Sequence, residues 1–233
     1  MNTRPIFGAH RLLLGALFSA TQMQGAITIY TDRTAWENAV SVAGGTAQTE
    51  DLNGIATETS FGAAPLTTSL GLTIYHTSAQ GFPSGQNSVQ NDGGAYNMNG
   101  SNYLQVDDDD PFAAGNLEFT FTAGTSVSSL GFDYRFFGEE PDQGLTSNLG
   151  LIQTKLENTS PGDLQTRFFG FVDDDPSQHY TLFRFTGENI GYSIDNISFA
   201  ETVPEPGTGI LGLIAATLLF KRKRQLTQDQ LSL

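Results

Sequence analysis

The chain has 233 residues, with 25 acidic and 11 basic side chains, a formal net charge of −14 at pH 7 and no cysteine. Six of the cations lie near the two ends of the chain, so only five remain between residues 27 and 202. Five scattered cations cannot form the basic patch that a nucleic-acid-binding protein needs, and the absence of cysteine excludes disulfides and thiolate sites.

The N-terminus has the features of a secretory signal peptide. Arg4 and Arg11 precede the apolar run LLLGALFSA (residues 12–20), and Ala26 is a small residue at which cleavage can occur. We therefore expect residues 1–26 to be removed and the rest of the chain to be exported.

One helix is expected near the start of the exported chain, in TAWENAVSVAG (residues 34–44). Thr34 and Glu37 have the spacing of a capping box, Trp36 and Val40 fall one turn apart, and the final glycine is a typical stop. We expect this helix to cover one end of a sandwich. A single tryptophan on a short helix favours a core position, and sugar stacking on Trp36 is the alternative.

The middle of the chain has the period-two alternation of β-strands. In residues 116–123, Leu117, Phe119 and Phe121 alternate with polar side chains, and residues 130–137 alternate in the same way. Turns rich in Gly, Asn, Asp and Pro separate further expected strands at residues 70–77, 102–106, 150–157, 166–172, 180–186 and 192–199. The pattern predicts an all-β ectodomain over residues 27–202: an antiparallel, jelly-roll-like β-sandwich with one short N-terminal helix.

Two segments of the ectodomain share a weak internal similarity. Residues 106–134 and residues 172–199 each contain an acidic run, a proline, a Phe-x-Phe strand and a closing hydrophobic strand. This pattern favours two hairpin-like units that pair across the sandwich, with convergence of strand composition as the equal alternative.

Three acidic runs are the sharpest candidates for site chemistry: Asp107, Asp108, Asp109 and Asp110; Glu139, Glu140 and Asp142; and Asp173, Asp174 and Asp175. Packed carboxylates repel one another, and calcium relieves this repulsion by binding six to eight oxygens. None of the runs has the EF-hand spacing. Calcium bound by the first and third runs is therefore one interpretation, and solvated acidic loops that keep sheet edges apart are the other.

The sequence offers few catalytic groups. His76 and His179 lie beside expected strands, outside any nucleophile or metal motif, and we expect them at the surface. A glycoside hydrolase needs two carboxylates that face a cleft, and acidic residues are too abundant here to single out a pair. We therefore predict that the protein is not an enzyme.

The C-terminus contains a short motif, an apolar run and a basic cluster in succession, followed by a polar tail over residues 225–233. The apolar run over residues 207–220 is shorter than the ~20 residues that span a bilayer comfortably, so it would span marginally, as a transmembrane helix without a polar face. The basic cluster should stay cytoplasmic, which places the ectodomain on the periplasmic side of the inner membrane.

This C-terminal segment, residues 203–224, resembles the PEP-CTERM sorting signal of Gram-negative bacteria. The residues that carry the resemblance are Val203, Pro204, Glu205 and Pro206, together with Lys221, Arg222, Lys223 and Arg224. The resemblance implies recognition by an exosortase, a membrane protease or transpeptidase, and release or transfer to the cell surface. Residues 27–40 and 170–200 also resemble the ends of the β-sandwich domain that often precedes this signal.

These observations predict an exported protein that is anchored transiently in the inner membrane and then lies at the cell surface or in the extracellular matrix. We expect it to associate with exopolysaccharide or biofilm in a structural or adhesive role. The alternative is a calcium-dependent carbohydrate-binding module in which exposed Tyr96, Tyr103 or Trp36 stacks on sugar rings. A cryptic glycoside hydrolase is the third reading.

Overall fold

The computed structural model describes residues 26–62, 64–77, 87–106, 116–123, 125–136, 144–153, 156, 165–175, 177–186 and 191–201. The predicted signal peptide up to residue 25, the sorting signal, the polar tail and the acidic residues at positions 107–110, 139, 140 and 142 lie outside these ranges. Within the described ranges, no helix combines the length and the apolar character that a bilayer crossing requires.

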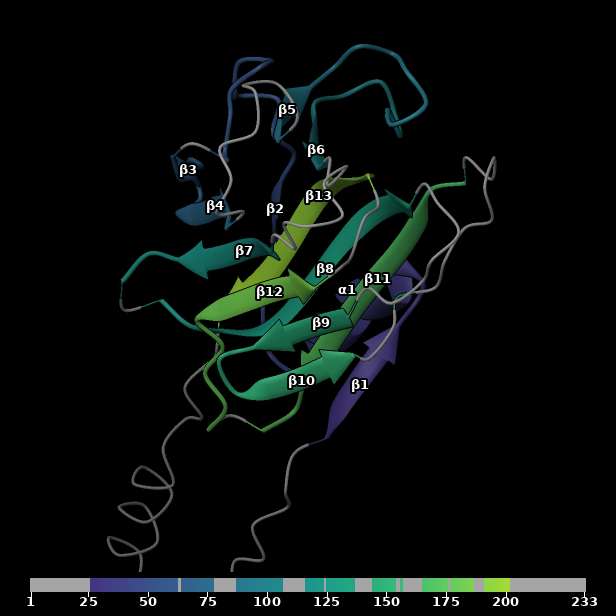
Figure 1. Cartoon of the computed structure of the whole chain (residues 1–233). Coiled ribbons are helices and arrows are strands. Elements are labelled where there is room, and N and C mark those ends of the chain that lie inside the picture. Colours follow the sequence, from purple (N-terminus) through teal and green to yellow (C-terminus); the bar gives the residue numbers. More distant parts are fainter. Residues whose placement is uncertain are drawn as a thin grey trace, which may run out of the picture.

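The described residues form an antiparallel β-sandwich with one helix, which confirms the predicted fold class (Figure 1). Sheet A contains, in spatial order, β1 (Ile27–Tyr30), β11 (Arg167–Asp173), β8 (Val127–Phe136), β13 (Tyr192–Glu201), β6 (Tyr103–Val106) and β5 (Ser88–Gln90), with β2 (Gln48–Glu50) also paired to β13. Sheet B contains β10 (Gly150–Gln153), β9 (Gly144–Ser147), β12 (Leu182–Thr186), β7 (Asn116–Phe121), β4 (Leu72–His76) and β3 (Leu66–Thr67).

The core between the sheets consists of the side chains that the alternation predicted to point inward. Leu117 and Phe119 of β7 and Leu130 and Phe132 of β8 are fully buried. Rings from the two sheets meet edge to face, and the centroids of Phe132 and Phe185 are 5.0 Å apart. Because each such pair contributes about 1 kcal/mol beyond the area that it buries, these phenylalanines stabilise the fold and are not ligand contacts.

The predicted helix is α1 (Arg33–Val42), but its N-cap is one that the sequence reading missed. The carboxylate of Asp32 accepts a hydrogen bond from the backbone nitrogen of Ala35 at 2.8 Å, so Asp32 caps the helix and the predicted Thr34–Glu37 capping box is wrong. An aspartate in this position satisfies one of the free N–H groups of the first turn, worth about 1 kcal/mol.

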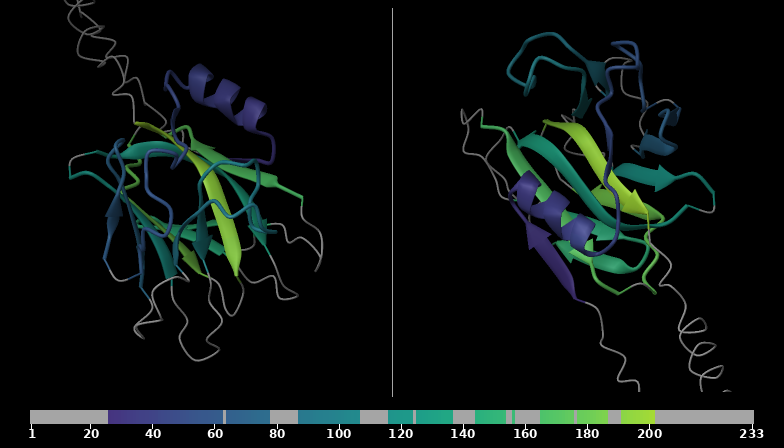
Figure 2. Two further views of the ribbon diagram at one scale, coloured as in Figure 1. Left: turned by 90° about the horizontal axis from the view of Figure 1, so that it is seen from above. Right: turned by 180° about the vertical axis from the view of Figure 1, so that it is seen from behind.

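Helix α1 lies on the outer face of sheet A (Figure 2). The prediction that it would cover one end of the sandwich is therefore wrong. Trp36 is fully buried there, and its indole nitrogen donates to the carbonyl oxygen of Phe171 at 2.9 Å. The ring rests on two glycines: a Cβ at Gly170 would lie 2.6 Å from Trp36 Cδ1, and one at Gly131 would lie 3.2 Å from Trp36 Cε2. The bare backbone at these positions lets the helix approach the face of the sheet.

The two similar segments of the sequence occupy equivalent places in the fold. The first begins at the last residue of β6 and contributes β7 and most of β8, and the second begins at the end of β11 and contributes β12 and most of β13. β7 pairs with β12 in sheet B, and β8 pairs with β13 in sheet A between β11 and β6. The order β11-β8-β13-β6 is symmetric about the β8–β13 boundary. The two units therefore pair strand with strand within each sheet, but neither unit is a hairpin, because its two strands lie in different sheets.

Strand β1 begins, and strand β13 finishes, at the same end of sheet A. Ile27, which opens β1, pairs with Asp173 at the end of β11, and Ser129 near the start of β8 pairs with Ala200 near the end of β13. Arg135 lies near the other end of β8, and the loop between β5 and β6 packs there (Figure 1).

Candidate functional site

The outer face of sheet A carries polar side chains where α1 does not cover it. Because side chains alternate along a strand, Asp133 and Arg135 of β8 point to this face while their neighbours enter the core. On β13, Asp195 pairs with Asp133 and Ser193 pairs with Arg135. Four polar side chains therefore form a compact patch at the centre of the sheet.

The segment between β5 and β6, residues 91–102, packs on this patch, and we call it the asparagine loop. The Nη1 atom of Arg135 donates to the carbonyl oxygens of Ala95 at 3.0 Å and Asn97 at 2.7 Å. Ser193 Oγ donates to the carbonyl oxygen of Tyr96 at 2.8 Å. Partial burial under the loop lowers the pKa of Arg135. The sheet thus fixes the backbone of the loop from below.

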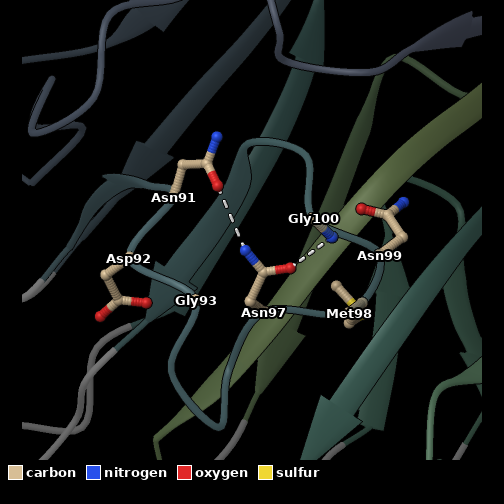
Figure 3. A pocket seen from close by; sticks show the side chains of 7 residues that line it. All are labelled: Asn91, Asp92, Gly93, Asn97, Met98, Asn99 and Gly100. Carbon is tan, nitrogen blue, oxygen red and sulfur yellow. Dashed lines mark hydrogen bonds between the residues drawn. The ribbon is translucent and has the colours of Figure 1, made fainter.

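The asparagine loop lines an open surface pocket of about 510 Å³, shown in Figure 3, and we call it the asparagine pocket. It is lined by Asn91, Asp92, Gly93, Asn97, Met98, Asn99 and Gly100. The Asn97 carboxamide lies at its centre: Nδ2 donates to Asn91 Oδ1 at 3.2 Å, and Oδ1 accepts from the backbone nitrogen of Gly100 at 2.6 Å. The pocket is therefore polar and is dominated by carboxamide groups.

Asp92 is the charged residue in the lining of the pocket. Hydrogen bonds from the backbone nitrogen of Gly94 and then from the Tyr103 hydroxyl lower the pKa of this carboxyl. Tyr103 itself is fully buried, and burial raises the pKa of its hydroxyl, which donates to Asp92 Oδ1 at 2.8 Å. Asp92 is consequently ionised and held in one orientation at the rim.

Asp195 lies beneath the other end of the loop and is fully buried. Its Oδ2 atom accepts hydrogen bonds from Asn99 Nδ2 at 3.0 Å and from Ser101 Oγ at 2.8 Å. Burial raises the pKa of Asp195 to about 6, and the neighbouring carboxylate of Asp133 contributes in the same direction. A single buried carboxyl group thus ties two residues of the asparagine loop to the central strand of the sheet.

Asp133 is held by residues on its other side. Its Oδ1 atom pairs with Arg33 Nη2 of α1 at 3.1 Å, and its Oδ2 atom accepts from Asn196 Nδ2 at 2.8 Å. Asn196 has a φ of 49° at the register shift between Asp195 and Ser198, a left-handed conformation that asparagine tolerates better than most residues. Because of this β-bulge, Asn196 follows Asp195 directly on the strand and still donates to the carboxylate of Asp133.

The third acidic run, Asp173–Asp175, follows β11, far from the asparagine pocket along the sheet. The Oδ2 atom of Asp173 accepts from the Tyr180 hydroxyl at 2.6 Å, and Asp175 Oδ1 accepts from the backbone nitrogen of Ser177 at 2.9 Å. Among the described residues, no group of three or more His, Asp or Glu side chains is arranged to hold a metal ion. Calcium at these positions stays a prediction.

Two of the three aromatic residues expected to stack on sugars are fully buried. Trp36 has the core position that the sequence favoured, and Tyr103 also has no exposed surface, so the alternative in which these two rings are accessible is wrong. Tyr96 is half-buried, and its hydroxyl would lie 2.7 Å from a Cβ at Gly191. The aromatic rings near this site therefore pack against the sheet and support the loop.

The two histidines differ from each other in the structure. His179 is exposed, as expected, and lies 3.2 Å from Ser126 Oγ. His76 is buried at the end of β4, beside Asn87, so its expected surface position is wrong. Burial lowers the pKa of His76 to about 4. Its period-two position with Leu72 and Ile74, which are also buried, was the signal that identified it as an inward-facing residue.

The asparagine pocket was not among the sites predicted from the sequence. The run NDGGAYNMNGSN consists mainly of asparagine and glycine, which are common turn residues and do not by themselves indicate a site. Its unusual density of carboxamides over residues 91–102 was the available signal. The contacts with Arg135 and Asp195 could not be read from it, because those residues are 38 or more positions away.

Comparison with known proteins gives only weak similarities. The sequence matches no protein-family model and no curated protein. An aspartate-to-alanine variant of a family 29 carbohydrate-binding module complexed with mannohexaose is 14% identical over 67% of this chain and 92% of that chain, with a TM-score of 0.36. The catalytic unit of a GH87 α-1,3-glucanase from Streptomyces thermodiastaticus is 15% identical over 60% of this chain and 28% of that chain, with a TM-score of 0.33. Similarity at this level carries no argument about function.

Proposed function

We propose that the chain is an exported β-sandwich protein that binds polysaccharide at the asparagine pocket and has a structural or adhesive role in the extracellular matrix. The observation that supports this most directly is a concave pocket of about 510 Å³ that is dominated by carboxamide side chains. A carboxamide has two donor hydrogens and an acceptor oxygen, so Asn91 and Asn97 keep hydrogen-bonding capacity for sugar hydroxyls beyond the bonds that they make within the loop.

The fixed backbone of the loop supports the same proposal. The asparagine loop is held to the sheet by three side chains, those of Arg135, Ser193 and Asp195, through hydrogen bonds of 2.7 to 3.0 Å. A ligand that enters a loop already held in place does not have to order it, and this reduces the entropic cost of binding.

Sorting by an exosortase belongs to the proposal and rests on the sequence signal at residues 203–224. On this proposal the prolines at 204 and 206 keep the cleavage segment extended, as a protease cleft requires, and the apolar run holds it at the inner membrane. The partners are then the exosortase during export and extracellular polysaccharide afterwards.

The proposed activity is binding and not hydrolysis. Asp133 and Asp195 are cross-strand partners on one face, which is the arrangement that a hydrolytic pair would need. However, Asp195 is fully buried beneath Asn99 and Ser101, and Asp133 is paired with Arg33. In this arrangement the two carboxyl groups do not both face a ligand, as an acid and base pair must, because Asp195 is buried.

A glycan array probed with the full chain in mild detergent tests the proposed function. We expect the unmodified chain to bind at least one polysaccharide. The pocket variants Asn97→Ala and Met98→Ala should bind it more weakly, Asn97→Ala by at least tenfold. The Asn38→Ala variant should bind it as the unmodified chain does. Asn38 is an exposed asparagine of α1 that lies outside the pocket. Circular dichroism establishes that each variant is folded.

A chelator arm separates the two forms of the proposal. Binding that disappears in EDTA and returns with calcium would support a calcium-dependent module, whereas unchanged binding would favour direct recognition by carboxamides. Absence of binding to every glycan would contradict polysaccharide recognition and leave only a matrix role without a ligand.

A further inference from the structure

A second cavity, of about 530 Å³, opens on the same outer face of sheet A. Its walls come from the turn before α1 (residues 31–33), from Asp133 of β8 and from residues 165–168 at the start of β11. Gln165 and Thr166 are exposed, whereas Phe168 is buried against Trp36. We call it the β11 pocket.

Arg135 joins the two pockets. Its Nη1 atom donates to the carbonyl oxygens of Ala95 and Asn97 in the asparagine loop, and its Nε atom donates to Thr166 Oγ1 in the wall of the β11 pocket at 3.1 Å. One guanidinium group therefore contacts the rims of both cavities. Asp133 lines the β11 pocket and lies two residues before Arg135 on the same face of β8.

The two cavities share one kind of polar group. The lining of the asparagine pocket includes the carboxamides of Asn97 and Asn99, and that of the β11 pocket includes the carboxamide of Gln165 and the hydroxyl of Thr166 beside the charged Asp32, Arg33, Asp133 and Arg167. Groups of this kind both donate and accept hydrogen bonds and carry no charge. A repeating ligand could thus be bound by similar contacts at both cavities.

The charges around the cavities disfavour an anionic ligand. Asp92 is the charged residue in the lining of the asparagine pocket, and the chain as a whole carries a formal charge of −14. The lining of the β11 pocket balances Asp32 and Asp133 against Arg33 and Arg167, and the guanidinium of Arg33 is engaged by Asp133, Ser198 and the carbonyl oxygen of Asn196. A polyanion would meet an acidic rim at one end and would be repelled by the whole molecule.

We propose that the asparagine pocket and the β11 pocket form one extended binding site, bridged by Arg135, for the interior of a neutral polysaccharide chain. This inference rests on the proposed function and deepens it. It states that the ligand is a chain of several uncharged sugar units lying across the outer face of sheet A, and not a terminal sugar held in one pocket.

Titration calorimetry with oligosaccharides of graded length tests this site. The probes are neutral gluco-, manno- and galacto-oligosaccharides of one to six units, with oligogalacturonates of the same lengths as the acidic series. We expect the affinity of the full chain for the best neutral series to rise about tenfold or more between two and six units, an increase of about 1.4 kcal/mol in binding free energy.

The two pockets are separated by matched variants. Gln165→Ala and Thr166→Val should remove the gain with length and leave the affinity for the shortest ligand unchanged, whereas Asn97→Ala should weaken binding at every length. Asn38→Ala on the exposed face of α1 is the control and should follow the unmodified chain. A thermal melt of each variant excludes loss of folding as the cause.

The failures of the two proposals can be distinguished. Two results would overturn the extended site and leave the asparagine pocket intact. One is an affinity that stops rising at two sugar units. The other is normal binding of the hexasaccharide by Gln165→Ala and Thr166→Val together with weakened binding by Asn97→Ala. Tighter binding of oligogalacturonates than of neutral chains would overturn the assignment to neutral ligands. If no oligosaccharide of either series bound, both proposals would fail.

Discussion

Asp195 and His76 are both buried, and burial moves their pKa values in opposite directions. The pKa of Asp195 is raised from 3.8 to about 6, so the stability that its proton provides is complete below pH 3.8 and is lost as the pH rises through 6. The pKa of His76 is lowered from 6.5 to about 4, so its contribution is complete above pH 6.5 and is lost as the pH falls through 4. As the pH rises from about 4 to about 6, the titration of Asp195 therefore lowers the free energy of unfolding while that of His76 raises it.

Replacing Asp195 with asparagine should reveal the dependence that His76 imposes. In the Asp195→Asn variant we expect the free energy of unfolding to rise between pH 4 and pH 6.5. Relative to the unmodified chain, the variant should gain on the order of 2 kcal/mol at pH 7 compared with pH 4, because asparagine does not titrate. Its one carbonyl oxygen can replace only one oxygen of Asp195, and this loss is the same at both pH values. Urea unfolding at the two pH values measures this difference. Parallel profiles for the two chains would contradict the assigned shift of Asp195.

Replacing His76 with glutamine should have the opposite effect on the pH profile. The free energy of unfolding of His76→Gln should fall between pH 4 and pH 6, because only the titration of Asp195 then remains from this pair. His179→Gln changes an exposed histidine and is the matched control, with a profile like that of the unmodified chain. The prediction is wrong if the two histidine variants behave alike.

The sequence could predict which strand residues point inward, but not which polar residues become buried. Inward positions such as Phe119 and Phe132 follow from local alternation, which requires no knowledge of the rest of the fold. Asp195 lies on the opposite face of its strand from the core, yet it is buried beneath Asn99, which is 96 positions away in the sequence. A contact over that distance leaves no local pattern.

At the scale of elements, α1 is attached to sheet A through close contact with bare backbone. The existence of the helix was predictable, because Trp36 and Val40 mark a single apolar side, and both are buried. Its place on the sheet was not predictable, because it depends on Gly131 and Gly170, which lie on different strands and in the sequence resemble ordinary weak points in a strand.

Adding a methyl group at Gly170 should displace the helix. The new Cβ would lie 2.6 Å from Trp36 Cδ1 and 2.8 Å from Phe168 Cε1, so we expect Gly170→Ala to lower the free energy of unfolding by about 2 kcal/mol. Gly54→Ala is the control, since a Cβ there would meet nothing within 4 Å. Chemical denaturation of both variants measures the difference, and equal stabilities would show that the packing of α1 adapts.

At the scale of the whole molecule, the paired units place β8 and β13 at the centre of sheet A, where the polar patch lies. The similarity between residues 106–134 and 172–199 made this pairing predictable, because similar units form similar strands that can lie side by side. The asparagine loop belongs to neither unit, since it precedes β6, and so the repeat gave no indication of the candidate site.

The predicted sorting signal can be tested on the mature protein in its own host. We expect mass spectrometry of the surface material to show a new C-terminus near Glu205 and a new N-terminus near Ala26, because both flanking segments should be removed during export. Removal of residues 203–224 should prevent retention at the cell surface. Intact residues 225–233 on surface material would contradict processing by an exosortase.

The register of sheet A, in which Ile27 and Ala200 share one side while Arg135 lies toward the other, determines how the domain would be presented. An attachment just beyond Glu201 would hold the sandwich at the end opposite the asparagine loop. The asparagine loop, which carries the proposed binding site, would then point away from the layer to which the protein is attached.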